Sequence, residues 1–237
     1  MPKIAFLFPG QGAQAVGMGR ELYDELPAAR ALFDRAGAIL GFDLKAVCFE
    51  GPAAALEATD VSQPAIFVAS LAALEGLKSS HPEVVAACAG AAGLSLGEYT
   101  ALAFAGALDF EGALKIVRRR GEAMQAAAAA VPSGMTSVLG LDEAAVDELC
   151  GQVAEHGRLW KANLLGPGNI VVSGDTSALA HVETVATGLG ASPGTIAGSV
   201  SPHRPGHRAQ APIGSTRGRA VRPSPRASSV GSGHGRS

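Results

Sequence analysis

Short apolar runs alternate with longer helical patterns along the first 130 residues. The run "KIAFLF" (3–8), which stops at Pro9-Gly10, predicts a buried strand. Residues 83–93 fit either a helix or a strand because of their alanines, but Val84, Val85 and the glycines that follow favour a central strand that leads into a tight turn. Strands separated by helices are typical of an α/β layered fold with a parallel sheet. The expected helices cover residues 19–39 with a break at Leu26-Pro27, residues 63–78 as a buried helix, residues 98–108, and residues 109–130 with Asp109 as N-cap.

After about Pro132 the pattern changes to five short elements in the order β-α-β-β-α. They are expected at residues 135–141, 142–157, 159–164, 168–174 and 175–190, with the turn Gly166-Pro167-Gly168 between the last two strands. This order supplies all but the closing strand of the ferredoxin-like β-α-β-β-α-β unit. The closing strand should follow residue 190, where the composition changes, and we expect it to be missing.

The last 47 residues differ from the rest of the chain in composition. Residues 191–237 are dense in Gly, Pro, Ser and Arg and contain no Leu, Phe, Trp or Tyr. They hold seven arginines and no acidic residue, which leaves 12 of the 19 basic and all 21 acidic side chains in the first 190 residues. Such a segment buries too little apolar surface to offset its ordering entropy, so a disordered tail is predicted.

Three parts are therefore expected: an α/β main domain at 1–131 without its C-terminal return, a ferredoxin-like subdomain at 132–190, and the tail at 191–237. Apolar residues make up 47% of the chain, but no stretch of 18 apolar residues is free of charge, so no membrane partner is expected. Cys48, Cys88 and Cys150 lack the spacing of metal ligands, which predicts buried thiols, no metal site and a reduced, cytoplasmic setting.

A serine lies between two glycines in "GLSLG" (93–97), which matches the G-x-S-x-G pattern. Ser95 is either a nucleophile on a strained strand-to-helix turn or one small residue among many in a chain with 31 glycines. The expected strand before it and helix after it favour the nucleophile. The amide of Leu96 would then lie at a helix N-terminus, where a negative oxygen is stabilised.

A second glycine-rich stretch, "FPGQGAQAVGMG" (8–19), follows the first expected strand. It lacks both the Walker lysine spacing and a G-x-G-x-x-G motif, which disfavours a phosphate-binding loop. The stretch is either an exposed tight turn or a loop at the carboxyl edge of the sheet, where open α/β folds place their sites. In the second case the backbone N–H of Gln11 is the expected second oxyanion donor.

Four motifs together resemble the malonyl-CoA:acyl-carrier-protein transacylase family of type II fatty acid synthesis. They are "FPGQGAQ" (8–14), "T-x-x-x-QPAIF" (59–67), "GLSLGEYTAL" (93–102) and "RRRGEAMQ" (118–125). The resemblance covers about residues 3–190 and implies a hydrolase-like parallel-sheet main domain with an inserted ferredoxin-like α+β subdomain. It also implies a monomer that needs no cofactor, with malonyl-CoA and acyl carrier protein as its substrates.

The resemblance implies roles for five residues. Ser95 would attack the malonyl thioester and form a malonyl-serine ester, while the amides of Gln11 and Leu96 hold the oxyanion. Arg120 would clamp the free malonyl carboxylate, for which guanidinium geometry is suited. Met124 would line the acyl pocket, although a methionine in a helix core is nearly as good an interpretation. Arg118 and Arg119 are expected on a solvated helix face.

The chain departs from the family pattern at three places. Leu94 stands where histidine is commoner, and Asn169 stands where glutamine is usual, with Asn163 kept; both asparagines are expected at the hairpin near the site. The family's general base is a histidine in a Gly-Ala-Phe-His motif, and the chain contains no such motif. The chain as written is therefore expected to be impaired, because a general base speeds such reactions by about two to four powers of ten.

The chain contains six histidines that could replace the missing base. His81, His156 and His181 are expected to be bystanders, and His203, His207 and His234 lie in the tail. His203 is the one weak candidate, by its distance from the subdomain. One set of codons for residues 198–203, displaced by one base, encodes Gly-Ala-Phe-His-Pro. A tail read out of frame is therefore one hypothesis, and the DNA sequence across codons 188–210 tests it.

Two other classes of function stay open. One is a different G-x-S-x-G acyl enzyme, either a hydrolase or a polyketide-type acyltransferase; a hydrolase has no need to clamp a carboxylate. The other is a non-catalytic remnant or a binding module whose basic tail contacts nucleic acid. Seven arginines without lysine or interleaved aromatic residues are a weak signal for nucleic acid, and no nucleic-acid partner is expected.

Overall fold

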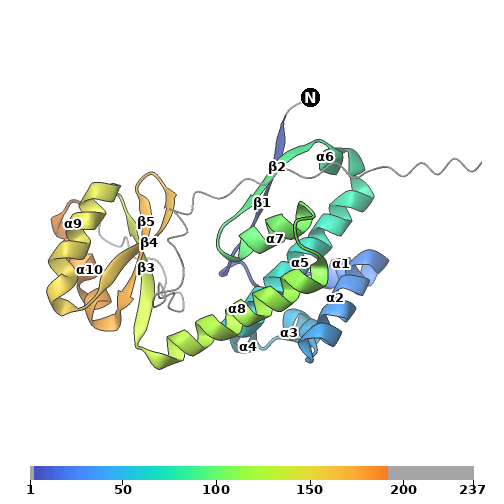
Figure 1. Cartoon of the computed structure of the whole chain (residues 1–237), viewed down its shortest axis with the longest axis horizontal. Helices are drawn as coiled ribbons and strands as arrows, with labels where there is room; N and C mark the ends of the chain where they lie inside the picture. The colour runs from blue at the N-terminus through green and yellow to red at the C-terminus, as the bar shows by residue number, and fades with distance from the viewer. Residues whose placement is uncertain (1–2, 192–237) are drawn as a thin grey trace, which may run out of the picture.

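The structure, a computed structural model, describes residues 3–191 and places them in two lobes joined by one long helix (Figure 1). The predicted absence of a closing strand, the predicted disordered tail and His203 all concern residues outside this range.

The first lobe contains a parallel pair of strands packed against helices. Strand β1 (Ile4–Phe8) runs beside β2 (Cys88–Gly93), with Phe8 opposite Gly93 at the ends of the two strands. The parallel pairing, with helices between the strands in the chain, confirms the α/β class. The helices of this lobe are α1 (Arg20–Glu25), α2 (Pro27–Leu40), α3 (Leu44–Glu50), α4 (Ala53–Glu57), α5 (Thr59–Ser80), α6 (Pro82–Ala86) and α7 (Leu96–Phe104).

Helix α5 forms the centre of the first lobe and packs along α8 (Phe110–Ala130), the helix that leads to the second lobe (Figure 1). Phe33 of α2, Phe67 of α5 and Leu114 of α8 are fully buried in one apolar cluster. Asp109 caps α8 by accepting a hydrogen bond from the N–H of Gly112 at 2.8 Å, as predicted. The predicted buried helix at 63–78 and the break after Leu26 are confirmed as well.

Two predicted boundaries were wrong. Helix α5 begins at Thr59, so Pro64 lies inside it, because the buried packing of this segment outweighs one missing backbone hydrogen bond. Val84 and Val85 belong to α6 and not to the second strand, which begins at Cys88. Pro82 occupies the first turn of α6, where a fixed φ favours a helix over the strand that β-branched residues suggested.

The prediction that β1 is buried was half wrong. Phe6 and Phe8 pack against Phe104 of α7, with ring centroids 5.2 and 5.8 Å apart, but the side chain of Leu7 is 79% exposed. Leu7 lies on the opposite face of β1 from Phe6 and Phe8, and this side chain stays exposed among the described residues 3–191.

The second lobe follows the predicted β-α-β-β-α order. Its elements are β3 (Ser133–Leu139), α9 (Glu143–Val153), a short 3-10 turn (Ala154–His156), β4 (Leu159–Gly166), β5 (Asn169–Asp175) and α10 (Thr176–Gly188). The strands form an antiparallel sheet in the order β3-β5-β4, and α9 and α10 lie on one side of it (Figure 1). Val138, Val172 and Leu149 are among the residues that fill the core between sheet and helices.

Among the described residues no helix is long and apolar enough to cross a membrane. Cys48 is fully buried, and burial raises the pKa of its thiol to about 12, so it is a packed side chain and not a nucleophile at neutral pH.

Candidate active site

Ser95 lies on a sharp turn between β2 and α7. Its backbone has φ 54° and ψ −111°, and it is the one non-glycine residue with positive φ within residues 3–191. A serine in this region is strained by about 1 to 3 kcal/mol, and such strain persists where the surroundings force it. The geometry is that of the strand-to-helix turn that G-x-S-x-G sequences form.

The two glycines of the motif are required by close backbone contacts. A Cβ atom on Gly93 would lie 2.0 Å from the carbonyl carbon of Gly97, and one on Gly97 would lie 2.2 Å from the carbonyl oxygen of Phe8. Gly10 approaches the same turn, since a Cβ atom there would lie 2.7 Å from the carbonyl oxygen of Leu94. The turn with Ser95 is therefore wedged against the loop that follows β1.

Replacing Gly97 by alanine is expected to lower the free energy of unfolding by about 3 kcal/mol or more, because backbone atoms must move to admit the methyl group. The matched control is Gly151→Ala in α9, where an added Cβ atom meets nothing within 4 Å. This change should stabilise the protein by about 0.5 to 1 kcal/mol. Urea unfolding of both variants measures the difference, and equal stabilities would show that the turn is not tightly packed.

The loop after β1 brings Gln11 to the edge of the sheet that carries Ser95, because parallel strands end on the same side. The side-chain amide of Gln11 donates to the hydroxyl of Thr59 at 3.3 Å, and the N–H of Thr59 donates to the side-chain oxygen of Gln125 at 3.1 Å. Within residues 3–191, neither the N–H of Gln11 nor that of Leu96 has a hydrogen-bond acceptor.

Arg120 of α8 contacts Ser95 directly. Its Nη2 donates to the Oγ of Ser95 at 2.8 Å, and its Nη1 donates to the side-chain oxygen of Gln63 at 2.6 Å. The guanidinium also lies over the ring of Tyr99, 5.8 Å from the centroid. Burial lowers the pKa of Arg120, but an arginine remains charged at neutral pH. One partly buried positive charge is thus held in contact with the serine hydroxyl.

The neighbouring arginines have other contacts. Arg119 is 85% exposed along its side chain and pairs with Glu122 at 3.4 Å, as a solvated residue does. Arg118 also pairs with Glu122, and it donates to the backbone carbonyl of Leu40, which ties α8 to α2. Arg118 and Arg119 therefore share Glu122, and of the three arginines only Arg120 contacts Ser95.

Met124 lies one turn beyond Arg120, and its sulfur accepts a hydrogen bond from the amide of Gln63 at 3.1 Å. Gln63, Thr59 and Tyr99 also belong to this cluster, and the sequence predicted no role for them. The available signal for Gln63, which has no exposed surface, was its place directly before the apolar run of residues 64–69.

The histidines of the described chain lie away from this cluster. His81 follows α5, and His156 and His181 stack on each other in the second lobe, with ring centroids 3.6 Å apart. Within residues 3–191, the hydroxyl of Ser95 hydrogen-bonds Arg120 and no histidine. Asn163 and Asn169 lie on β4 and β5, on either side of the turn that joins those strands.

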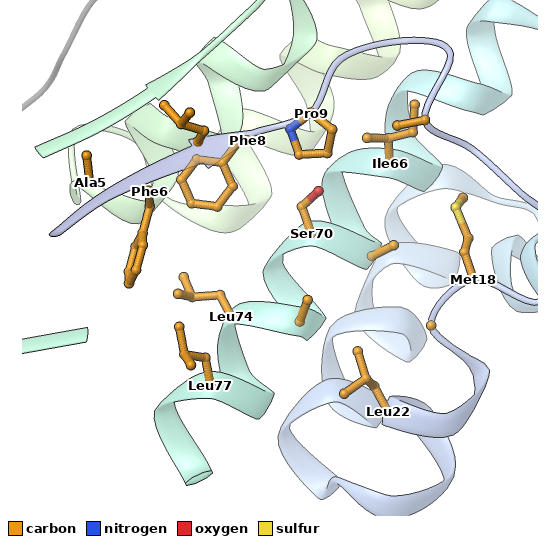
Figure 2. Close-up of a pocket in the computed structure, with 15 residues that line it drawn as sticks. Ala5, Phe6, Phe8, Pro9, Met18, Leu22, Ile66, Ser70, Leu74 and Leu77 are labelled. Carbon is orange, nitrogen blue, oxygen red and sulfur yellow. The ribbon is translucent and has the colours of Figure 1, made fainter. Parts of the chain in front are cut away.

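An apolar cavity of about 490 Å³ opens between β1 and α5 (Figure 2). Phe6, Met18, Leu22 and Leu74 line it, whereas Ser95 and Arg120 do not. Among the residues that line the cavity, Ser70 alone has a polar side chain. This cavity lacks charged groups and is separate from the cluster around Ser95.

Comparison with known proteins gives one consistent result. The model of the "Acyl transferase domain" family matches residues 5–208. A protein of Bacillus subtilis named malonyl CoA-acyl carrier protein transacylase is 48% identical over 177 residues, which cover 73% of this chain and 54% of that one.

Solved structures agree with the sequence relatives. The acyl-carrier-protein-S-malonyltransferase of Bartonella henselae superposes with a TM-score of 0.78 at 39% identity, over 85% of this chain and 64% of that one. A malonyl-transacylase solved in complex with its type II polyketide acyl-carrier protein gives a TM-score of 0.76 at 33% identity, with the same coverage of 85% and 64%. The chain thus spans less than two thirds of the length of these relatives.

Proposed function

Because this chain belongs to the acyl transferase domain family, we propose that it transfers a malonyl group from malonyl-CoA to acyl carrier protein through an ester on Ser95. The observation that carries the proposal is the 2.8 Å contact between Arg120 and the hydroxyl of Ser95. An acyl group bound to this serine has its far end beside a positive charge. Acyl groups with a carboxylate at that end gain a charge-assisted hydrogen bond, and others do not.

The same contact limits the length of the acyl group. A single guanidinium touches the nucleophile, so a carboxylate that it binds has to lie close to the carbonyl carbon under attack. The malonyl group separates its carboxylate from its thioester carbonyl by one methylene. Longer dicarboxylic groups would have to fold back to make both contacts, which costs conformational entropy. We therefore favour malonyl over longer carboxylated groups.

The proposed transfer has two half-reactions. The Oγ of Ser95 attacks the thioester carbonyl and loses its proton to a base, and the C–S bond then breaks to release coenzyme A as the protonated thiol. The amides of Gln11 and Leu96 stabilise the negative oxygen formed on the way, which fits the lack of any acceptor for these two N–H groups within residues 3–191. The thiol of the carrier protein then loses its proton to the base and attacks the ester carbonyl, which forms a new C–S bond. The C–O bond to Ser95 breaks, and the serine oxygen takes the proton back and becomes a hydroxyl again.

The base is the component that residues 3–191 do not supply next to Ser95. We propose that the chain as written turns over slowly for this reason, with His203 as the weak in-frame candidate. Donors and binding groups retain part of the rate when one member of a catalytic set is missing. Met124 is assigned to the acyl pocket, since its sulfur is tied to Gln63 beside Arg120.

The partner proposed for the second half-reaction is a phosphopantetheinyl acyl carrier protein. The names of the relatives support it, and one relative was solved bound to such a carrier. We further propose a monomer that acts in the cytoplasm and needs no cofactor, on the sequence grounds given above. The proposed domain boundaries at 131 and 190 lie close to the ends of α8 and α10.

The deciding experiment measures where the malonyl group goes. The protein is incubated with malonyl-CoA and holo acyl carrier protein, and malonyl carrier protein and free malonate are followed over hours. Transfer to the carrier thiol in excess over transfer to water is expected. Release as malonate alone would identify a hydrolase, and no consumption of malonyl-CoA above the rate without protein would identify a non-catalytic remnant.

A further inference from the structure

Gln63 is the one amide side chain that is fully buried within residues 3–191. It lies on α5 among apolar neighbours such as Ile66 and Phe67, and burying an amide there is unfavourable unless its hydrogen bonds are made. Both of its polar atoms do have partners. The oxygen accepts from Arg120 at 2.6 Å, and the nitrogen donates to the sulfur of Met124 at 3.1 Å.

The orientation of this amide follows from the chemistry of its partners. A guanidinium only donates hydrogen bonds, so the oxygen of Gln63 has to face Arg120. The NH₂ group is then directed at Met124, and a thioether sulfur can accept it weakly. The oxygen of Gln63 thus faces a donor and its nitrogen faces an acceptor, and this match holds the amide in a single orientation.

We propose that Gln63 is a positioning residue that fixes the guanidinium of Arg120 and thereby sets the preference for a carboxylated acyl group. This inference rests on the proposed function for its substrate. Gln63 holds Nη1, which leaves Nη2 directed at Ser95 and at the space where the acyl group is bound. Without Gln63, the charge stays in the site but the guanidinium is free to rotate away from the carboxylate.

A matched control can separate the proposed positioning role of Gln63 from a role that only links α5 to α8. Gln63 bridges α5 and α8, and so does the contact between Gln125 and the N–H of Thr59. The two bridges join the same two helices through a glutamine amide, but within residues 3–191 Arg120 is hydrogen-bonded to Gln63 and Ser95 and not to Gln125. Gln125→Leu is therefore the matched control for Gln63→Leu.

The first measurement is nitrogen NMR of the arginine guanidinium groups in the whole protein, with the signal of Arg120 assigned through Arg120→Lys. We expect separate, slowly exchanging Nη signals for Arg120 in the natural protein and in Gln125→Leu. In Gln63→Leu the two signals should merge because the group rotates. Gln63→Glu, which keeps an acceptor oxygen, should keep them separate.

The second measurement is the ratio of malonyl to acetyl ester formed on Ser95 from the two coenzyme A thioesters, read by mass. The ratio should fall at least about tenfold in Gln63→Leu, since small misplacements of binding groups cost this much, and should not change in Gln125→Leu. It should also fall in Gln63→Glu, because the new carboxylate competes with malonyl for Arg120. Separate Nη signals in Gln63→Leu, or an unchanged ratio there, would overturn the inference.

The two proposals fail in different ways. If the natural protein forms no malonyl ester while Arg120 still responds to Gln63→Leu in the NMR spectra, the proposed function fails and the positioning role stands. If the ester forms and the Arg120 signals ignore Gln63→Leu, the positioning role alone is wrong.

Discussion

Ser95→Ala is expected to abolish covalent labelling of the protein by malonyl-CoA, with the rate of ester formation falling at least about a thousandfold. The variant removes the only atom proposed to form a bond to the acyl group, while the turn, its two glycines and the free amides stay in place. The mass of the intact protein after an acid quench measures the ester, because acyl transfer from the coenzyme A thioester to the serine stops at low pH.

The control for this experiment is Ser80→Ala. Ser80 lies at the end of α5, about 25 Å along the helix from Gln63, and its hydroxyl donates to the carbonyl of Gly76. Labelling should be unchanged in this variant. Labelling that survives in Ser95→Ala would show that another nucleophile carries the acyl group and that the strained turn has a structural purpose alone.

Arg120→Ala is expected to lower the rate of malonyl transfer to Ser95 by about a hundredfold, which corresponds to about 3 kcal/mol. The loss should fall on malonyl and not on acetyl, because only malonyl carries the charge that pairs with the guanidinium. Arg119→Ala is the matched control, since its side chain is 85% exposed and pairs with Glu122 at the surface.

Rates of ester formation from malonyl-CoA and acetyl-CoA, measured for both variants, separate two interpretations of Arg120. A selective loss of malonyl supports the clamp. An equal loss of both substrates would mean that Arg120 serves the turn, through its hydrogen bond to the hydroxyl of Ser95, and not the carboxylate.

Local chemistry made several features predictable from the sequence. Asp109 and Asp142 cap their helices through side-chain oxygens, as short polar residues before apolar runs do. The turn at Ser95 followed from its two glycines and from the change of periodicity around it. The order of the second lobe followed from short apolar runs with clear turns between them.

Features that depend on tertiary packing were missed. Leu7 was expected to be buried because its strand is apolar throughout, but exposure depends on which element lies over that face. The sequence predicted no role for Gln63, since its two partners lie about 60 residues away on another helix. No pattern within α5 shows that a distant arginine needs a fixed acceptor.

The position of the site residues in the first lobe has a consequence for sequence changes in the second lobe. Ser95, Gln63 and Arg120 all belong to the first lobe or to the part of α8 packed against it, and the second lobe begins after α8 ends at Ala130. Changes in β3, β4 and β5 are therefore expected to leave in place the contact between Arg120 and Ser95, which we propose selects the acyl group.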